Sequence, residues 1–139
     1  MSKPTTLRIP DRTRQAIDLI VARTRRDFSS VANEMLEEAV RMRRLPGILF
    51  ADGPSGRRAR IAGTGIDVFE VVRSFQQLES NFDRLKESYH WLSELQLRVA
   101  LAYAATYPGE IEERISLEQS WSTSEAVHQA YPFTRCATT

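Results

Sequence analysis

The sequence has a single cysteine, Cys136, near its C-terminal end. An intramolecular disulfide is therefore impossible, and a cysteine-based metal finger is excluded as well. No apolar run approaches the length that spans a bilayer, and the opening segment, MSKPTTLRIP, lacks the apolar centre of a signal peptide. These absences predict a cytoplasmic protein that is not bound to a membrane.

Residues typical of enzymes are also scarce. The two histidines, His90 and His128, belong to no recognisable arrangement with a nucleophile and a carboxylate. The glycines of residues 63–65 lack the third glycine of a dinucleotide fingerprint, and no Gly-Lys-Ser/Thr follows them. The glutamates of residues 110–113 follow Pro108-Gly109, where carboxylates favour the start of a helix. The sequence predicts no catalytic residue, no cofactor and no metal.

The two halves of the chain carry opposite charge, although the net charge is only +1. Residues 1–62 contain 13 Lys and Arg against 7 Asp and Glu, whereas residues 63–139 contain 6 against 11. A basic segment attracts phosphates and releases their counterions, and an acidic segment is repelled by them. Any contact with nucleic acid is therefore expected near the N-terminus.

A chain of 139 residues with 42% apolar residues can bury one modest core or two very small ones. Proline and glycine punctuate it at Pro46-Gly47 and at Pro108-Gly109. We expect a mostly α-helical protein with three parts, which are an N-terminal unit at 1–45, a second small domain at 46–114 and a C-terminal extension at 115–139.

The N-terminal unit is predicted to be a strand followed by two helices. Residues 5–9 alternate apolar and polar side chains until Pro10, as a strand with one apolar face does. A helix is expected from Asp11, as N-cap, to about Arg26. A second helix, capped by the pair at 29–30, is expected to run to about Arg44 with an apolar face too wide for one partner helix. Such a unit predicts an intertwined homodimer with an unstable monomer.

The second domain is predicted to be a β-hairpin followed by helices. Turn-forming residues at 53–56 separate two short apolar segments. Asn81 and Ser93 are in positions to cap helices. The expected strands are 48–52 and 57–62, the expected helices are 67–79, 82–89, 93–106 and 110–121, and the Ser/Thr-rich end is expected to be loosely ordered.

Residues 4–44 resemble the ribbon-helix-helix family of Arc-, MetJ- and CopG-type repressors. The resemblance rests on the order strand, helix, helix, with Leu-Arg-Ile-Pro-Asp at the first junction and Phe-Ser-Ser-Val at the second. It implies that two chains pair their N-terminal strands into an antiparallel ribbon. Such a ribbon enters the major groove of double-stranded DNA, which is wide enough to admit it.

The resemblance also assigns roles to single residues. If Leu7 and Ile9 face the dimer core, the alternation of strand side chains turns the residues between them outward. The outward row is Pro4, Thr6 and Arg8. The Arg8 guanidinium can donate two hydrogen bonds to guanine, a contact that discriminates by roughly 1–3 kcal/mol. The alternative is an ordinary edge strand beside solvated arginines.

The start of the second helix is a candidate phosphate site. Its free N–H groups and partial positive charge suit a phosphate at Ser29 and Ser30. Such a contact positions the protein without reading sequence. Further candidates for phosphate contacts are Arg12, Arg14, Arg25 and Arg26.

Residues 47–114 resemble a small antitoxin-associated domain of unknown function, found in VapB-like antitoxins, with a hairpin and a helix-turn-helix core. The resemblance rests on Ala-Gly-Thr-Gly-Ile-Asp-Val at 62–68 and on the apolar spacing of 92–104. Gly65 and Asp67 stand where the family has arginine and proline. The helix expected at 93–106 offers Arg98 as its only cation, which favours packing over DNA reading.

The resemblance implies an antitoxin, because that family is commonly encoded beside PIN-like ribonuclease toxins. The N-terminal dimer would bind the operator and repress its own operon, and the acidic half would suit the positive groove of a ribonuclease. The tail either orders on the toxin or is a frayed terminus or a helix docked on its own domain. Its candidate toxin contacts are Trp121, Tyr131, Phe133 and Arg135.

Two alternatives to the antitoxin stay open. One is a stand-alone dimeric regulator whose C-terminal half senses a ligand or assembles dimers. The other is an interaction module with no role on DNA. A toxin encoded by the neighbouring gene would favour the antitoxin, and a solitary gene would favour the regulator.

Overall fold

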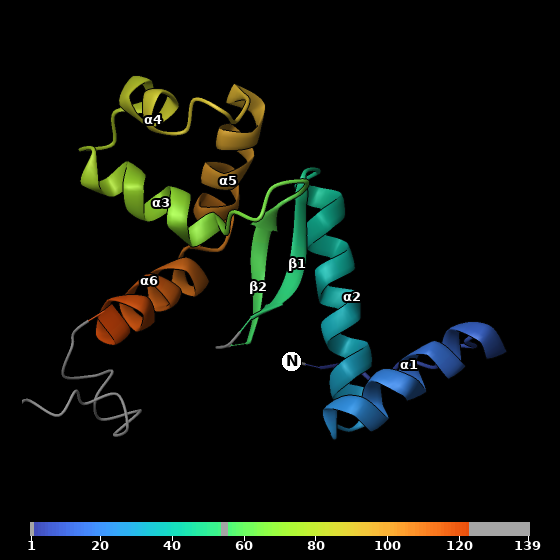
Figure 1. Ribbon diagram of the computed structural model, residues 1–139. Helices are drawn as coiled ribbons and strands as arrows, with labels where there is room; N and C mark the ends of the chain where they lie inside the picture. Colours follow the sequence, from blue (N-terminus) through green and yellow to red (C-terminus); the bar gives the residue numbers. More distant parts are fainter. Residues whose placement is uncertain (1, 54–55, 123–139) are drawn as a thin grey trace, which may run out of the picture. The chain divides into compact units, whose positions relative to one another are not determined.

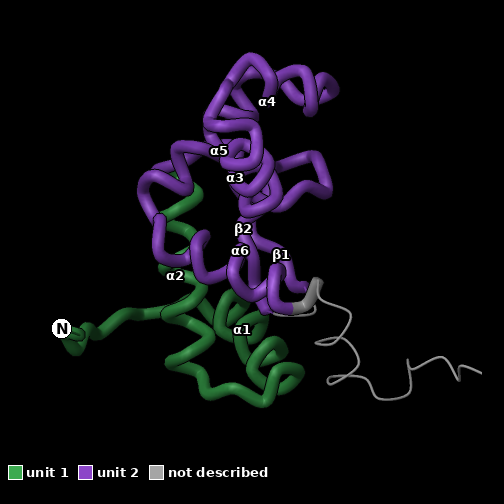
Figure 2. Tube along the Cα trace, turned by 90° about the vertical axis from the view of Figure 1, so that its left-hand side faces the viewer, with its two compact units in different colours: residues 1–43 green, residues 44–139 purple. Residues whose placement is uncertain are grey.

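The computed structural model describes residues 2–53 and 56–122. The described chain is mostly α-helical with one two-stranded antiparallel sheet, which confirms the predicted class (Figure 1). The chain divides into two compact units, residues 1–43 and 44–139, coloured separately in Figure 2. Within the described ranges, no helix combines the length and the apolar character needed to cross a membrane.

Unit 1 consists of an N-terminal segment, α1 (Asp11–Thr24) and most of α2 (Phe28–Arg44). The strand predicted at 5–9 is absent, because residues 2–10 have no strand beside them to which their backbone could hydrogen bond. α1 ends at Arg25, whose φ of 55° lies in the left-handed region. The two helices are nonetheless those that the apolar periodicity predicts.

The predicted N-caps of unit 1 are wrong by one or more positions. Pro10 occupies the cap position of α1, and Asp11 is its first helical residue. At α2, the Asp27 carboxylate accepts a hydrogen bond from the backbone N–H of Ser30 at 2.6 Å. Asp27 therefore caps α2, and Ser29 and Ser30 lie in its first turn.

Unit 2 begins with the hairpin of β1 (Ile48–Gly53) and β2 (Gly56–Ile61), which pair from Ile48 opposite Ile61 to Gly53 opposite Gly56. The predicted hairpin is therefore confirmed. Four helices follow, and α4 lies at the end of the helical group away from α6 (Figure 1). They are α3 (Val68–Gln77), α4 (Phe82–Ser88), α5 (Glu94–Thr106) and α6 (Pro108–Ser122).

Two of the predicted caps in unit 2 are confirmed. The Asn81 side chain accepts from the N–H of Arg84, and Ser93 forms a capping box with Gln96. Pro108 follows α5 and is also the first residue of α6. Proline suits this position, because a backbone N–H in the first turn of a helix has no hydrogen-bond partner within the helix. α6 continues past residue 115, where the boundary between the second domain and the C-terminal extension was expected.

The hydrophobic core of the described chain lies in unit 2. One face of the hairpin contributes Ile48 and Ile61, and the helices that cover it contribute larger side chains such as Tyr103. α3 packs against both α5 and α6. Side chains that are fully buried include Ile61, Val68, Val71, Leu85, Leu97 and Tyr103.

A buried ion-pair cluster joins the hairpin to α3. The Asp67 carboxylate, in a residue only 4% exposed, accepts hydrogen bonds from Arg58 at 2.7 Å and from Arg60 at 2.9 Å. Its backbone N–H donates to the Glu70 side chain at 2.8 Å, which completes a capping box at the start of α3. Asp67 therefore holds two arginines of β2 and the first turn of α3 together.

Replacing Asp67 by alanine is expected to destabilise unit 2 by about 3 kcal/mol, because Arg58 would keep a buried charge without this carboxylate. Urea unfolding followed by circular dichroism measures the effect. The matched control is Asp52→Ala, since the Asp52 carboxylate also pairs with an arginine of β2 but is 89% exposed. The control should cost less than about 0.5 kcal/mol. Equal effects of the two substitutions would show that the Asp67 cluster is not a stabilising feature.

Candidate nucleic-acid interface

Unit 1 carries an open apolar groove of about 580 Å³. Three segments form it, and its walls are almost entirely aliphatic. The lining residues are Leu7, Arg8, Ile9 and Pro10 of the N-terminal segment, Thr13, Ala16, Ile17 and Ile20 of α1, and Ala32, Met35, Leu36 and Ala39 of α2. The apolar stripes predicted for the strand and the two helices therefore converge on one surface.

This surface is poorly covered within the chain. Among the described residues of unit 1, only Ile17 and Val31 are buried, whereas Leu7 is 66% and Leu36 57% exposed. Burying one leucine side chain fully contributes about 1.5–3 kcal/mol to the free energy of unfolding. The exposed leucines of unit 1 do not make this contribution. Unit 1 therefore has very little core of its own, and its groove is an exposed apolar surface.

The side chains predicted to read DNA lie along the exposed N-terminal segment. Pro4, Thr6 and Arg8 are all exposed, and Ile9 is half-buried. Arg8 also lines the groove, next to Leu7. The chain alone thus presents the predicted row to solvent, without the paired strand that would fix which face each side chain occupies.

The predicted phosphate site at Ser29 and Ser30 is partly occupied by the protein itself. The N–H of Ser30 already donates to the Asp27 carboxylate. This hydrogen bond, with one from the Ser30 side chain and the nearby charge of Arg26, lowers the pKa of Asp27 below its usual value. A phosphate at this helix end would meet the ionised Asp27 carboxylate, which opposes phosphate binding. The capping role of Asp27 was not predicted from the sequence. The signal in the sequence was an aspartate three residues before Ser30, the spacing of an N-cap and the N–H that it accepts.

Two of the four candidate arginines are engaged within unit 1. The Arg14 guanidinium lies 3.9 Å from the centre of the Phe28 ring and donates to Asp18 at 3.2 Å. Arg26 donates to both carboxylate oxygens of Glu34 at 3.0 Å. These contacts fix the connection between α1 and α2. Arg12 and Arg25 are exposed and stay candidates for phosphate contacts.

The predicted toxin contacts fall almost entirely outside the described residues. Tyr131, Phe133 and Arg135 lie outside them. Trp121 belongs to α6, but its side chain is not among those that the structure describes.

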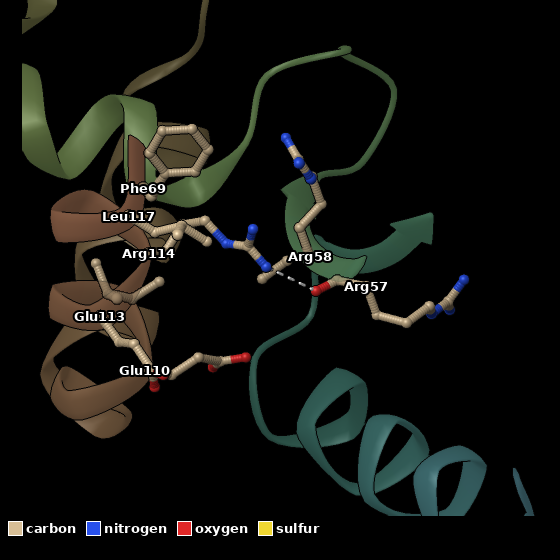
Figure 3. Close-up of a pocket in the computed structure, with 9 residues that line it drawn as sticks. Arg57, Arg58, Phe69, Glu110, Glu113, Arg114 and Leu117 are labelled. Atoms are coloured by element: carbon tan, nitrogen blue, oxygen red, sulfur yellow. Dashed lines mark hydrogen bonds between the residues drawn. The ribbon is translucent and has the colours of Figure 1, made fainter. Parts of the chain in front are cut away.

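Unit 2 has a smaller hollow of about 240 Å³ between β2, α3 and α6 (Figure 3). Across it, the Arg114 guanidinium donates to the backbone carbonyl of Arg57 at 3.3 Å. Three arginines and two glutamates line the hollow together with four apolar side chains. The lining residues are Arg57, Arg58, Ala59, Phe69, Glu110, Ile111, Glu113, Arg114 and Leu117.

His90 and the Gly-Thr-Gly segment at 63–65 make contacts that are typical of structural residues. His90 is exposed, and its ring packs edge-on against Trp91 at 5.1 Å. The Thr64 hydroxyl between the two glycines donates to the carbonyl of Ile61 at 2.8 Å and closes a turn. In the described part of the chain, no group of three or more His, Cys, Asp or Glu residues could hold a metal ion.

Comparison with protein-family models, with curated proteins and with solved structures finds no match to this chain. The residues and their geometry are therefore the basis for assigning a function.

The Asp27 cap predicts a pH-dependent contribution to stability. Because its pKa is lowered in the folded state, the contribution is fully present above the unfolded value near 3.9. It is lost as the pH falls through the lower, folded value. Asp27→Ala should therefore lower the Tm at pH 7, and the difference from wild type should shrink below about pH 4.

Thermal unfolding followed by circular dichroism between pH 2.5 and 7 tests this prediction. Asp27→Asn should retain the cap, since asparagine caps helices about as well as aspartate. Asp11→Ala is the matched control, because α1 has no side-chain cap hydrogen bond. A Tm difference for Asp27→Ala that does not change with pH would contradict the assignment.

Proposed function

We propose that this chain is the antitoxin of a toxin-antitoxin pair, which binds operator DNA as a homodimer, represses its own operon and neutralises a PIN-like ribonuclease. The observation that carries the DNA-binding half of the proposal is the exposed apolar groove of unit 1. Its walls come from the same three segments that form the dimer core in the ribbon-helix-helix family that residues 4–44 resemble.

A second copy of the chain is the proposed cover of the groove. Around a two-fold axis each copy offers the same groove and the same N-terminal segment, so each segment can lie along the other in an antiparallel ribbon. Leu7, which is mostly exposed in the single chain, then gains a buried environment together with Ile9 and Leu36. The pairing would supply both the missing core of unit 1 and a hydrogen-bond partner for the backbone of residues 5–9.

The paired segments also suit DNA recognition. With Leu7 and Ile9 turned inward, the alternation of the strand places Thr6 and Arg8 on the outer face. These side chains are exposed in the structure, and the first 62 residues carry the excess of positive charge. The outer face is therefore a basic ribbon of the width that the major groove admits.

The antitoxin half of the proposal is supported by charge. Residues 63–122 contain ten Asp and Glu against five Lys and Arg. Such a body is repelled by DNA and attracted by a protein surface that binds RNA. One chain thus holds a basic part for the operator and an acidic part for a basic protein.

A second candidate is a stand-alone regulator that senses a small ligand. The observation in its favour is the hollow of about 240 Å³ in unit 2, which is lined by arginine, glutamate and apolar side chains. Copurification with the product of the neighbouring gene distinguishes the two, because the antitoxin is expected to bind that product and the regulator is not.

The dimer predicts a large effect of a charge in the groove. Leu36→Glu should convert a dimer of 15.9 kDa chains into a poorly folded monomer, because an unpaired carboxylate would be buried against the second copy. Sedimentation velocity measures the mass. Leu19→Glu is the matched control, since Leu19 is 67% exposed in α1 and does not line the groove. A dimer that survives Leu36→Glu would exclude the groove as its interface.

Arg8→Ala is expected to abolish sequence-specific DNA binding while the dimer persists. Losing one arginine-guanine contact in each copy should weaken the specific complex by about 30-fold or more. Fluorescence anisotropy with DNA from upstream of the chain's own gene, against a shuffled duplex, measures the difference. Arg43→Ala, an exposed arginine near the end of α2, is the control. Specific binding that survives Arg8→Ala would rule out the ribbon.

A further inference from the structure

Another hollow of unit 2, of about 330 Å³, lies where the end of α3 meets the end of α4. Two aromatic rings, one leucine and three uncharged polar side chains form its walls, and none of the lining residues is an Asp, Glu, Lys or Arg. We name it the aromatic hollow. It shares no lining residue with the hollow of Figure 3. The lining residues are Ser74, Gln77 and Leu78 from the end of α3, and Ser88, Tyr89 and Trp91 from the end of α4 and the residues after it.

The aromatic wall is held in place by contacts with α3. The Tyr89 hydroxyl lies 3.0 Å from the Ser74 hydroxyl and donates to the backbone carbonyl of Glu70 at 3.4 Å. The Trp91 ring packs against the rings of Tyr89 and His90, with centroid distances of 5.5 and 5.1 Å. Trp91 nonetheless stays 61% exposed. An exposed ring whose orientation is restricted is suited to stack on a flat ligand, because little conformational freedom is lost on binding.

Three polar groups of the aromatic hollow make no hydrogen bond within the described part of the chain. They are the side-chain amide of Gln77, the hydroxyl of Ser88 and the indole N–H of Trp91. An amide offers a donor and an acceptor side by side, a hydroxyl offers either, and an indole N–H only donates. The hollow therefore combines surfaces for stacking with groups that can bond the edge of a ligand.

These features select one class of ligand. A charged ligand finds no opposite charge among the lining residues, and an aliphatic ligand would cover polar groups without bonding them. A neutral heterocycle stacks with its face and hydrogen bonds with its edge. Adenine presents its N6 donor beside its N7 acceptor, the pattern that a glutamine amide binds with two hydrogen bonds. A phosphate on the ligand would meet the negative field of residues 63–122.

We propose that the aromatic hollow binds an unphosphorylated adenine nucleoside, whose base stacks on Trp91 and hydrogen bonds to the amide of Gln77. The site adds a small-molecule function to unit 2. It does not rest on the proposed antitoxin function, so either proposal can fail without the other.

The first test titrates adenosine into the full-length chain. Trp121→Phe leaves Trp91 as the sole tryptophan, so its fluorescence should fall in a saturable way as adenosine binds. Trp91→Ala should raise the Kd from isothermal titration calorimetry at least about fivefold, as loss of base stacking does. Leu95→Ala is the control, since Leu95 is 76% exposed and does not line the hollow. Both alanine variants should keep the unfolding midpoint of the wild type, because both positions are exposed.

A second test separates recognition of the base from a general effect on α3. Gln77→Ala should remove the preference for adenosine over uridine, because the amide that matches the adenine edge is lost. Gln76→Ala is the matched control, since this neighbouring glutamine is also exposed but does not line the hollow. The ratio of the two Kd values is the readout, which a merely structural effect would not change. Equal changes in that ratio for the two variants would overturn the role of Gln77.

The remaining outcomes contradict the proposal directly. Fluorescence of Trp91 that does not saturate with adenosine would overturn the site. Glucose that binds as tightly as adenosine would show a site for neutral sugars instead of a base. Adenosine monophosphate or a short oligoadenylate that binds more tightly than adenosine would show a site for nucleotides or nucleic acid. The Arg8→Ala and copurification experiments test the proposed function independently of these results.

Discussion

Residues 1–43 depend on apolar surface that they cannot cover by themselves. The groove between the N-terminal segment, α1 and α2 collects most of the aliphatic side chains of this unit, and two of its leucines stay largely exposed. Hydrophobic burial is the dominant favourable contribution to folding, so a unit that leaves this surface open has little with which to offset its loss of chain entropy. In the proposed dimer, a second copy would supply the missing surface and would also pair the segment that carries Arg8.

Unit 2 buries its apolar side chains within one chain. Its hairpin and helices enclose a shared core, and Asp67 links β2 to α3 through two arginines. Removing one partner of such a buried ion pair costs more than the pair adds to the net stability, because desolvation offsets much of the attraction and the remaining charge stays buried. The chain therefore combines a unit with a shared core and a unit whose apolar groove is open, and the proposed DNA site lies in the second.

The sequence was sufficient to predict the helices and the hairpin, because apolar periodicity and turn residues act locally. Asn81 and Ser93 were recognised as caps since each is followed at once by a helix. The caps of unit 1 were predicted wrongly because several capping residues stand side by side there, and Asp27 competes successfully with Ser29 and Ser30. The choice among neighbours depends on backbone angles that periodicity does not determine.

Other features of the sites depend on tertiary contacts and could not be predicted. The burial of Asp67 requires arginines from a strand earlier in the chain, and only the hairpin register brings Arg58 and Arg60 to one carboxylate. The exposure of Leu95 on α5 was equally hidden, because a leucine in a largely apolar helix is normally buried. The strand at 5–9 differs in kind, since its partner strand would belong to another molecule.

The open groove has a consequence for how the amount of this protein controls its activity. With a second copy as the cover, the folded form of unit 1 is a product of association, and its abundance at low concentration rises with the square of the chain concentration. Halving the supply of chain then lowers the folded, DNA-competent form by about fourfold. In the proposed dimer, unpaired chains would expose residues 1–43 to proteases while unit 2 keeps its own core. Degradation would then begin at the proposed DNA-binding end and sharpen the response further.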